Sequence, residues 1–222
     1  MMTSRDNHLW LQLWRDRRTD FHQETVNQWL TRFWPGLDHA TGSRVFVPLC
    51  GKSLDMLWLA GQGHEVIGVE LSPIAVRAFF KENRLQPVKR RIGKFTLWKH
   101  GNISILCGDY FLLDKTDLGH IDTVYDRAAL TALPEDLRSL YVEHLRLIVP
   151  ETSDIFLLTI EDAEEGETPE QAHCVDEEVA ALYSEGFEIN LAHVESAFEL
   201  DRESSHETLK RTEYKVYRLS NR

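Results

Sequence analysis

The sequence predicts an α/β fold in which strands alternate with helices, and the stretch 45–70 carries the main evidence. Residues 45–47 form a short β-branched and aromatic run, typical of a strand buried on both faces of a parallel sheet. Gly51 then marks a sharp turn into a helix, and residues 66–69 form a second apolar strand that ends at Glu70. This order is that of a βαβ unit. Three apolar positions share one face of the expected helix: Leu54, Leu57 and Trp58.

Glu70 stands at the carboxyl end of the second strand, where folds of this kind bind their ligands. A carboxylate at that point can accept hydrogen bonds from both hydroxyls of an adenosine ribose, so Glu70 is a candidate binding residue. An ordinary turn between a strand and a helix, with a surface glutamate further on, would give the same pattern. Taken alone, the glycine and the acid are therefore a weak signal.

Two nucleotide-binding motifs are incomplete in this stretch. The run from Gly51 to Ser53 resembles the end of a phosphate-binding loop, but that loop needs an earlier glycine where Phe46 stands. A dinucleotide fingerprint needs three glycines and only Gly51 is present, which argues against a nicotinamide-dependent oxidoreductase. One glycine followed by an acid suits an adenosyl ligand that lacks phosphate groups.

The composition favours a single domain, residues 1–222, with an acidic surface. Its 25 Lys and Arg against 36 Asp and Glu give a net charge of −11, which disfavours nucleic acid as a partner because phosphate backbones are repelled. No apolar run is long enough to span a bilayer, and the start lacks the apolar stretch of a signal peptide, so we expect no membrane partner and a cytoplasmic protein. Three cysteines without zinc spacing and ten histidines without a ligand pattern predict no metal site.

The N-terminal segment, residues 1–34, is unusually rich in aromatic residues. Trp10 and Trp14 are four positions apart and share a helix face, and Phe21 follows a polar stretch. Packing of these rings onto the domain is the simplest explanation. A functional alternative is a lid over a ligand that carries a sulfonium cation, because aromatic faces attract cations.

The remaining elements follow in alternation. Ser72 and Pro73 predict the start of a helix that buries Ala75, Val76, Phe79 and Phe80. Two charged stretches, the basic 81–94 and the acidic 161–170, are interpreted as loops. Helices are also expected after Pro134 and at 176–183. Strands are expected at 95–98, 103–107, 121–125, 155–160, 187–194 and 214–219, the last two as an antiparallel edge pair.

Six motifs stand in order between residues 10 and 130: WLQLW at 10–14, FHQ at 21–23, VFVPLCGKSLDM at 45–56, GHEVIGVELS at 63–72, GNISILCGD at 101–109 and YDRAAL at 125–130. In this order they make the sequence resemble the thiopurine S-methyltransferase family, in its bacterial branch. The resemblance implies a doubly wound, mostly parallel seven-stranded sheet with helices on both faces, the fold of class I methyltransferases. It also implies S-adenosylmethionine as methyl donor, and a small thiopurine or another thiol, selenium or tellurium compound as acceptor.

Residue by residue, the resemblance implies the following donor contacts: Trp14, Leu49, Glu70 and Arg127, with Asp109 and Tyr110 flanking the adenine. It places Phe21 near the site of methyl transfer. One departure is the run EQAHCV at 170–175, where the family has small residues and proline, and this region helps to shape the acceptor site. We expect a monomer, since no heptad or apolar stripe is evident.

Arg127 is the candidate with the most direct chemical role. Its guanidinium stays charged at any working pH and can hold a carboxylate or stabilise a thiolate acceptor. A structural salt bridge to Asp126 or Glu161 is the alternative. A protein of another class, a binding module that holds the adenosyl ligand without catalysis, would share the same fold and the same residues.

Overall fold

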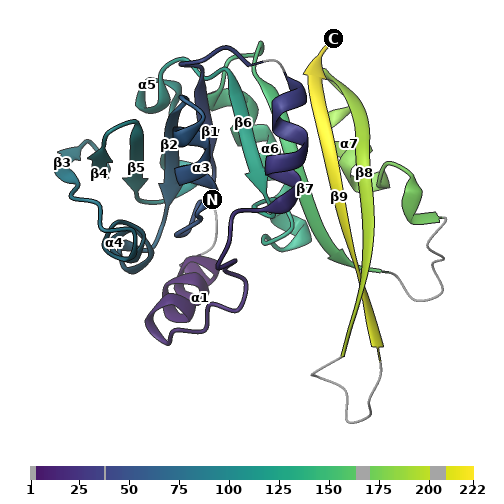
Figure 1. The fold of residues 1–222 in the computed structure, drawn as a ribbon, viewed down its shortest axis with the longest axis horizontal. Helices are drawn as coiled ribbons and strands as arrows, with labels where there is room; N and C mark the ends of the chain where they lie inside the picture. The colour runs from purple at the N-terminus through teal and green to yellow at the C-terminus, as the bar shows by residue number, and fades with distance from the viewer. Residues whose placement is uncertain (1–3, 38, 164–170, 201–208) are drawn as a thin grey trace. The chain divides into compact units, whose positions relative to one another are not determined.

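The structure is a computed structural model that describes residues 4–37, 39–163, 171–200 and 209–222 (Figure 1). The chain divides into two compact units, residues 1–124 with 144–150, and residues 125–143 with 151–222. This division does not decide the number of domains, so the single domain of 1–222 stays a prediction.

Nine strands make up the sheet of the described residues, in the order β3-β4-β5-β2-β1-β6-β7-β9-β8. Strand β1 pairs in parallel with β2 and β6, and β2 with β5. The pairs β3–β4, β4–β5, β7–β9 and β8–β9 are antiparallel. The strands are β1 (Arg44–Val47), β2 (Glu65–Glu70), β3 (Val88–Ile92), β4 (Phe95–His100), β5 (Ile103–Cys107), β6 (Thr123–Arg127), β7 (Asp154–Asp162), β8 (Phe187–Leu200) and β9 (Leu209–Asn221).

The α/β class is confirmed, but the count of seven strands is wrong. Strand β3 lies within the basic stretch 81–94 that was expected to be a loop. Its residues are exposed except for the half-buried Ile92, and it pairs only with β4 among the described strands. An edge strand that buries neither face carries no alternation of apolar and polar residues, so the pattern could not reveal it.

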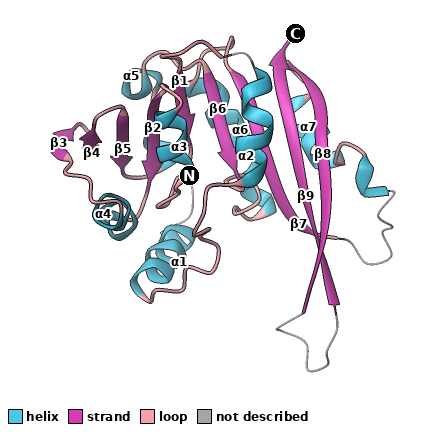
Figure 2. Cartoon of the chain, viewed as in Figure 1, coloured by secondary structure: helices cyan, strands magenta, loops and turns pink. Residues whose placement is uncertain are grey.

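Helices stand between many of the strands along the chain, whereas β3, β4 and β5, and also β8 and β9, follow one another without a helix (Figure 2). They are α1 (Ser4–Arg15), α2 (Gln28–Phe33), α3 (Asp55–Gly61), α4 (Pro73–Glu82), α5 (Lys115–Leu118), α6 (Glu135–Ile148) and α7 (Glu177–Tyr183), with short 3-10 turns η1 (Trp34–Leu37), η2 (Tyr110–Leu112) and η3 (Gln171–His173). Of the helices that the structure describes, none combines the length and the apolar character needed to cross a membrane.

In the first unit, helix α4 behaves as predicted and helix α3 does not. Ser72 caps α4, Pro73 begins it, and its four predicted core residues are buried. Helix α3 instead buries Asp55, Met56 and Leu59, and the face of Leu54, Leu57 and Trp58 is only half-buried. On the buried face, the Asp55 carboxylate accepts a 2.8 Å hydrogen bond from the Asn27 amide, so this face and not the predicted one is held against the N-terminal segment.

In the second unit, β7, β9 and β8 form an antiparallel group. The predicted edge pair is confirmed, and both strands are longer than expected, with 14 residues in β8 and 13 in β9. Strand β7 runs on to Asp162, so the first two residues of the predicted acidic loop belong to a strand. Most of the remaining loop, 164–170, lies outside the described residues.

Candidate functional site

The βαβ unit brings Glu70 and Gly51 into direct contact. Glu70 is the last residue of β2, and its Oε2 accepts a hydrogen bond from the Gly51 amide at 2.9 Å. Its Oε1 accepts a second bond from the Ser72 amide at 2.6 Å. Gly51 has a φ of +54°, a conformation that glycine adopts without the steric cost of a Cβ. One carboxylate therefore joins the turn after β1 to the start of α4.

The environment of Glu70 is dry and shifts its acidity. Burial raises the pKa of Glu70 to about 7, although the amide hydrogen bonds, that of Ser72 foremost, favour the charged form. Burial also raises the pKa of the Cys107 thiol to about 11, with the charge of Glu70 acting in the same direction. The Cys50 thiol has a raised pKa for the same two reasons. Both thiols are therefore protonated at neutral pH and poorly nucleophilic.

Leu49 occupies a strained position in the same turn. Its φ of +45° lies in the left-handed region, which costs a bulky residue roughly 1–3 kcal/mol. The neighbouring Cys50 amide donates to the Val69 carbonyl at 2.9 Å, which ties the turn to β2. Strain of this kind concentrates at ligand-binding turns, so the conformation supports the prediction that Leu49 contacts the donor. No sequence pattern predicts a left-handed conformation at this leucine.

The aromatic N-terminal segment packs onto this turn. The Trp14 ring is buried and so close to Gly51 that a Cβ there would lie 3.3 Å from Trp14 Cζ2. Phe21 meets Trp10 and Trp14 edge to face, with ring centroids 5.4 and 5.5 Å apart, and stays 44% exposed. Trp14 thus packs on the domain, as the simpler interpretation has it, and a lid that includes Phe21 stays a prediction.

Helix α1 also reaches the end of β5. Asn7 Nδ2 donates to Asp109 Oδ2 at 3.0 Å, and Asp109 Oδ1 accepts from the Phe111 amide at 3.0 Å, which starts η2. The Tyr110 ring is only 2% exposed and packs edge to face on His144. The structure therefore gathers Trp14, Glu70 and Asp109 in the first unit, and a contact of Tyr110 with adenine stays a prediction.

Arg127 ends β6 and belongs to the second unit, where Asp126 is its neighbour. Asp126 is fully buried, and its Oδ1 accepts from the amides of Ala129 and Leu130 at 3.0 and 3.3 Å. Its Oδ2 accepts from the Tyr141 hydroxyl at 2.7 Å. Burial raises the pKa of Asp126 to about 6, and the charge of Arg127 is one of the influences that oppose the rise. Asp126 thus anchors the chain after β6.

Glu161, one of the two partners considered for a salt bridge with Arg127, pairs with another arginine, and the structural role of Arg127 stays a prediction. The Oε1 of Glu161 lies 2.6 Å from Nη1 of Arg138. Ala128, directly after Arg127, has a φ of +57°, so the second candidate strand end carries backbone strain like the first.

Sequence reasoning missed Asn7, Asp55 and Asp126 as organising residues. A carboxylate three residues before an amide that it accepts from is a capping pattern, so Asp126 could have been found from its spacing to Ala129. Asn7 and Asp55 act over long separations in the chain, and no local signal predicts them. Within the described ranges, no group of three His, Cys, Asp or Glu side chains could hold a metal ion, and the absence of a metal site stays a prediction.

Solved structures with the same fold define the class of this chain. A S-adenosylmethionine-dependent methyltransferase from Anabaena variabilis matches with a TM-score of 0.61 at 16% sequence identity, over 97% of this chain and 95% of that one. The N-terminal domain of EvdMO1 with SAH bound matches with a TM-score of 0.59 at 19% identity, over 91% of this chain and 83% of that one. The chain thus has the fold of S-adenosylmethionine-dependent methyltransferases.

Sequence comparison gives the family. The family model described as thiopurine S-methyltransferase (TPMT) matches residues 5–222. A thiopurine S-methyltransferase of Stutzerimonas stutzeri is 67% identical over 219 residues, which are 99% of this chain and 92% of that protein. The chain belongs to the thiopurine S-methyltransferase family, and the resemblance found in its motifs is confirmed.

Proposed function

We propose that the protein is a S-adenosylmethionine-dependent methyltransferase that transfers a methyl group to the sulfur of thiopurines or of related thiol, selenium or tellurium acceptors. Membership of the family supports the reaction. The single structural observation that carries the donor site is the buried Glu70 carboxylate, held at a strand end by the amides of Gly51 and Ser72.

The residues present fit an adenosyl donor. Each oxygen of the Glu70 carboxylate has two lone pairs, and the amides of Gly51 and Ser72 each bond to a different oxygen, which leaves acceptor capacity for ribose hydroxyls. The glycine turn carries no phosphate-binding fingerprint, which agrees with a ligand that has none. Trp14 and the exposed face of Phe21 supply aromatic surface for a cationic sulfur.

When bound, the donor supplies a methyl group on a sulfonium that is already a reactive electrophile. The chain's own residues then orient and desolvate rather than activate. Holding two reactants in line can contribute roughly 7–11 kcal/mol, more than a single acid or base supplies. Glu70 fixes the ribose, Leu49 offers backbone and side chain from its strained turn, and Trp14 with Phe21 excludes water.

Arg127 is proposed as the residue that steadies the anionic acceptor. A thiolate is the nucleophilic form of a thiol, and a fixed guanidinium lowers the pKa of a thiol beside it. Each unit of that lowering corresponds to about 1.4 kcal/mol. We also propose that the protein is monomeric and cytoplasmic. A third proposal is that it does not act on nucleic acid, which the net charge of −11 supports.

The test is a methyl-transfer assay with labelled donor and a panel of thiopurine, aliphatic thiol and selenium acceptors, beside calorimetry of donor binding. We expect donor binding and transfer to at least one sulfur acceptor. Donor binding without transfer to any acceptor would favour the non-catalytic binding module, and absence of donor binding would overturn both functions.

A further inference from the structure

The loop that follows Arg127, residues 128–134, is held from both ends by buried side chains, and we call it the post-β6 loop. Asp126 holds its first residues through the amides of Ala129 and Leu130. Within the loop, the Ala132 amide donates to the Ala128 carbonyl at 2.9 Å. The left-handed Ala128 lies between Arg127 and these bonds, so the position of the loop bears directly on the backbone of Arg127.

Arg138 holds the other end of the post-β6 loop. Its Nε donates to the Leu133 carbonyl at 3.1 Å, and its Nη2 donates to the Thr131 carbonyl at 3.4 Å. The same guanidinium places Nη1 2.6 Å from Glu161 Oε1 and 2.5 Å from Glu178 Oε2. The Arg138 side chain is only 11% exposed, so these bonds replace most of its hydration. One side chain therefore joins the loop to the end of β7 and to α7.

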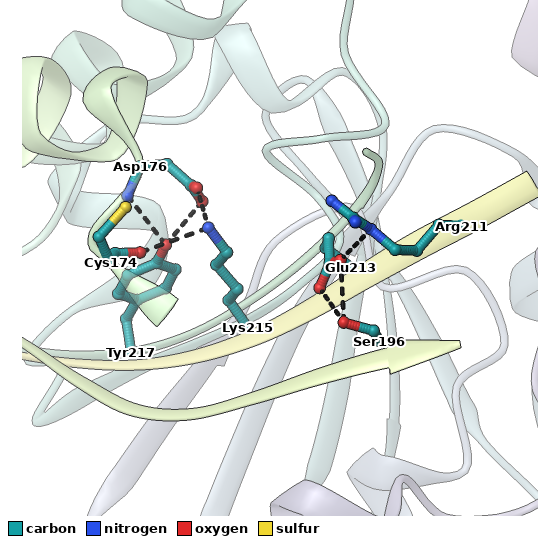
Figure 3. A network of polar contacts seen from close by, with 7 residues as sticks. All are labelled: Cys174, Asp176, Ser196, Arg211, Glu213, Lys215 and Tyr217. Carbon is teal, nitrogen blue, oxygen red and sulfur yellow. Dashed lines mark hydrogen bonds and ion pairs between the residues drawn. The ribbon is translucent and has the colours of Figure 1, made fainter. Parts of the chain in front are cut away.

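The start of helix α7 is held by side chains of β9, and α7 in turn carries a partner of Arg138. Asp176, which precedes α7, accepts from the Tyr217 hydroxyl at 2.6 Å and from the Lys215 ammonium, both on β9 (Figure 3). Lys215 also donates to the Cys174 carbonyl at 3.3 Å (Figure 3). Lys215 is 4% exposed, so the anchor is buried. Glu178, two residues after Asp176, then presents its carboxylate to Arg138.

The two carboxylates around Arg138 depend on its positive charge. Burial raises the pKa of Glu161, and the charges of Glu178 and Asp176 add to the rise while Arg138 opposes it. Without its guanidinium, two carboxylates would face each other and two loop carbonyls would lose their donor. A lysine could not replace it, because a single ammonium cannot present the planar fork that reaches four acceptors.

We infer that Arg138 is a positioning residue for methyl transfer: by clamping the post-β6 loop to β7 and α7, it sets where Arg127 meets the acceptor. This inference rests on the proposed function. Arg138 acts on turnover through the position of Arg127 and not through contact with either reactant.

A double-mutant cycle on the full-length protein tests the inference. Turnover of a thiopurine is measured, with the donor held above its Kd, for the wild type, Arg138→Met, Arg127→Ala and the double variant. We expect Arg138→Met to lower kcat about tenfold or more, with a smaller change in donor affinity, and to cause no further loss in the Arg127→Ala background. A merely structural Arg138 would lower kcat by the same factor in both backgrounds, and that result overturns the inference.

Two further variants keep the test decisive. Glu178→Gln leaves Arg138 with Glu161 and the loop carbonyls, and replaces Arg138→Met in the same cycle should that variant fail to fold; we expect a loss of about threefold that also vanishes without Arg127. Asp162→Asn, which breaks the exposed ion pair with Lys210 next to Glu161, is the matched control and should leave kcat unchanged. A wild type that binds the donor but methylates no acceptor would instead overturn the proposed function, and this inference with it.

Discussion

The strand ends at Glu70 and Asp126 use the same device for different purposes. Each has a buried carboxylate that accepts from two backbone amides, and each lies near a non-glycine residue with a left-handed φ, Leu49 in one case and Ala128 in the other. The difference is the third partner. Asp126 also accepts from the Tyr141 hydroxyl, whereas the bonds described for Glu70 come from backbone amides.

The third partner separates Glu70, which we propose binds the donor, from Asp126, which holds the protein's own backbone. The Tyr141 hydroxyl and two backbone amides supply hydrogen-bond donors to Asp126 from within the protein, so Asp126 holds the loop before Arg138. Glu70 is held in place by amides and keeps capacity for donors from a ligand. Substitutions at the two carboxylates should therefore act on different quantities, donor affinity for Glu70 and stability for Asp126.

Removing the Glu70 carboxylate should have the largest effect, a weaker binding of the methyl donor. For Glu70→Ala we expect a loss of about 3 kcal/mol of binding free energy, roughly 100-fold in Kd, because two hydrogen bonds to a charged group are lost. Calorimetry with S-adenosylmethionine measures it. Glu82→Gln, which breaks the exposed pair with Lys52, is the control and should bind normally. Equal affinity of Glu70→Ala and wild type would remove Glu70 from the site.

Removing the Asp126 carboxylate should instead cost stability. For Asp126→Asn we expect a loss of about 2 kcal/mol in the free energy of unfolding, with donor affinity changed less than about twofold, because the loop amides and the Tyr141 hydroxyl lose a charged acceptor. Urea unfolding measures the change. Tyr141→Phe removes one of the three bonds and should cost about 1 kcal/mol. A larger effect on donor affinity than on stability would contradict the structural role.

The pH dependence of stability and of donor binding should have opposite signs. The pKa is raised in the folded chain to about 7 for Glu70 and to about 6 for Asp126. At pH values between the ordinary pKa and the raised pKa, each carboxyl therefore binds more protons in the folded chain than in the unfolded one. Their contribution to the free energy of unfolding therefore falls as pH rises through this window. Donor affinity should rise through about pH 7 as Glu70 ionises. Glu70→Gln should flatten the pH dependence of donor binding and leave only the contribution of Asp126 to the pH dependence of stability, and a wild type with both curves of the same sign would refute the assignment.

The smallest effect should come from the turn itself. Gly51→Ala adds a Cβ 3.3 Å from the Trp14 ring at a φ of +54°, so we expect about 1 kcal/mol of destabilisation and a few-fold weaker donor binding. Gly42→Ala is the matched control, since its φ is also positive at +88° and its Cβ would meet open space. Thermal unfolding and calorimetry on both variants separate backbone strain from displacement of Trp14.

The sequence predicts the parts of the fold that are periodic and local. The strand at 66–69 ending at Glu70, the capped start of α4 and the hairpin of β4 and β5 all follow from spacing and turn chemistry. Edge strand β3 buries too little to leave a pattern, and the buried face of α3 is decided by Asp55 and Asn27 across 28 positions. Long-range hydrogen bonds of this kind have no local signature.

The candidate site divides in the same way. The contact between Glu70 and Gly51 is a property of one βαβ unit and could be inferred from it. The Arg138 clamp could not, because its partners at Thr131, Glu161 and Glu178 lie on three segments whose meeting depends on the packing of the whole unit. The motif resemblance indicated Arg127 as a candidate residue, but it gave no indication of the contacts that hold the loop after it.

The charged edge strand β3 has a consequence for behaviour at high concentration. Lys89, Arg90 and Arg91 would face their own copies if two molecules tried to join their sheets edge to edge, and like charges at that spacing repel. Salt screens such repulsion within a few ångströms at molar ionic strength. Concentrated stocks of the protein should therefore stay clear in dilute buffer and grow turbid first where salt is high.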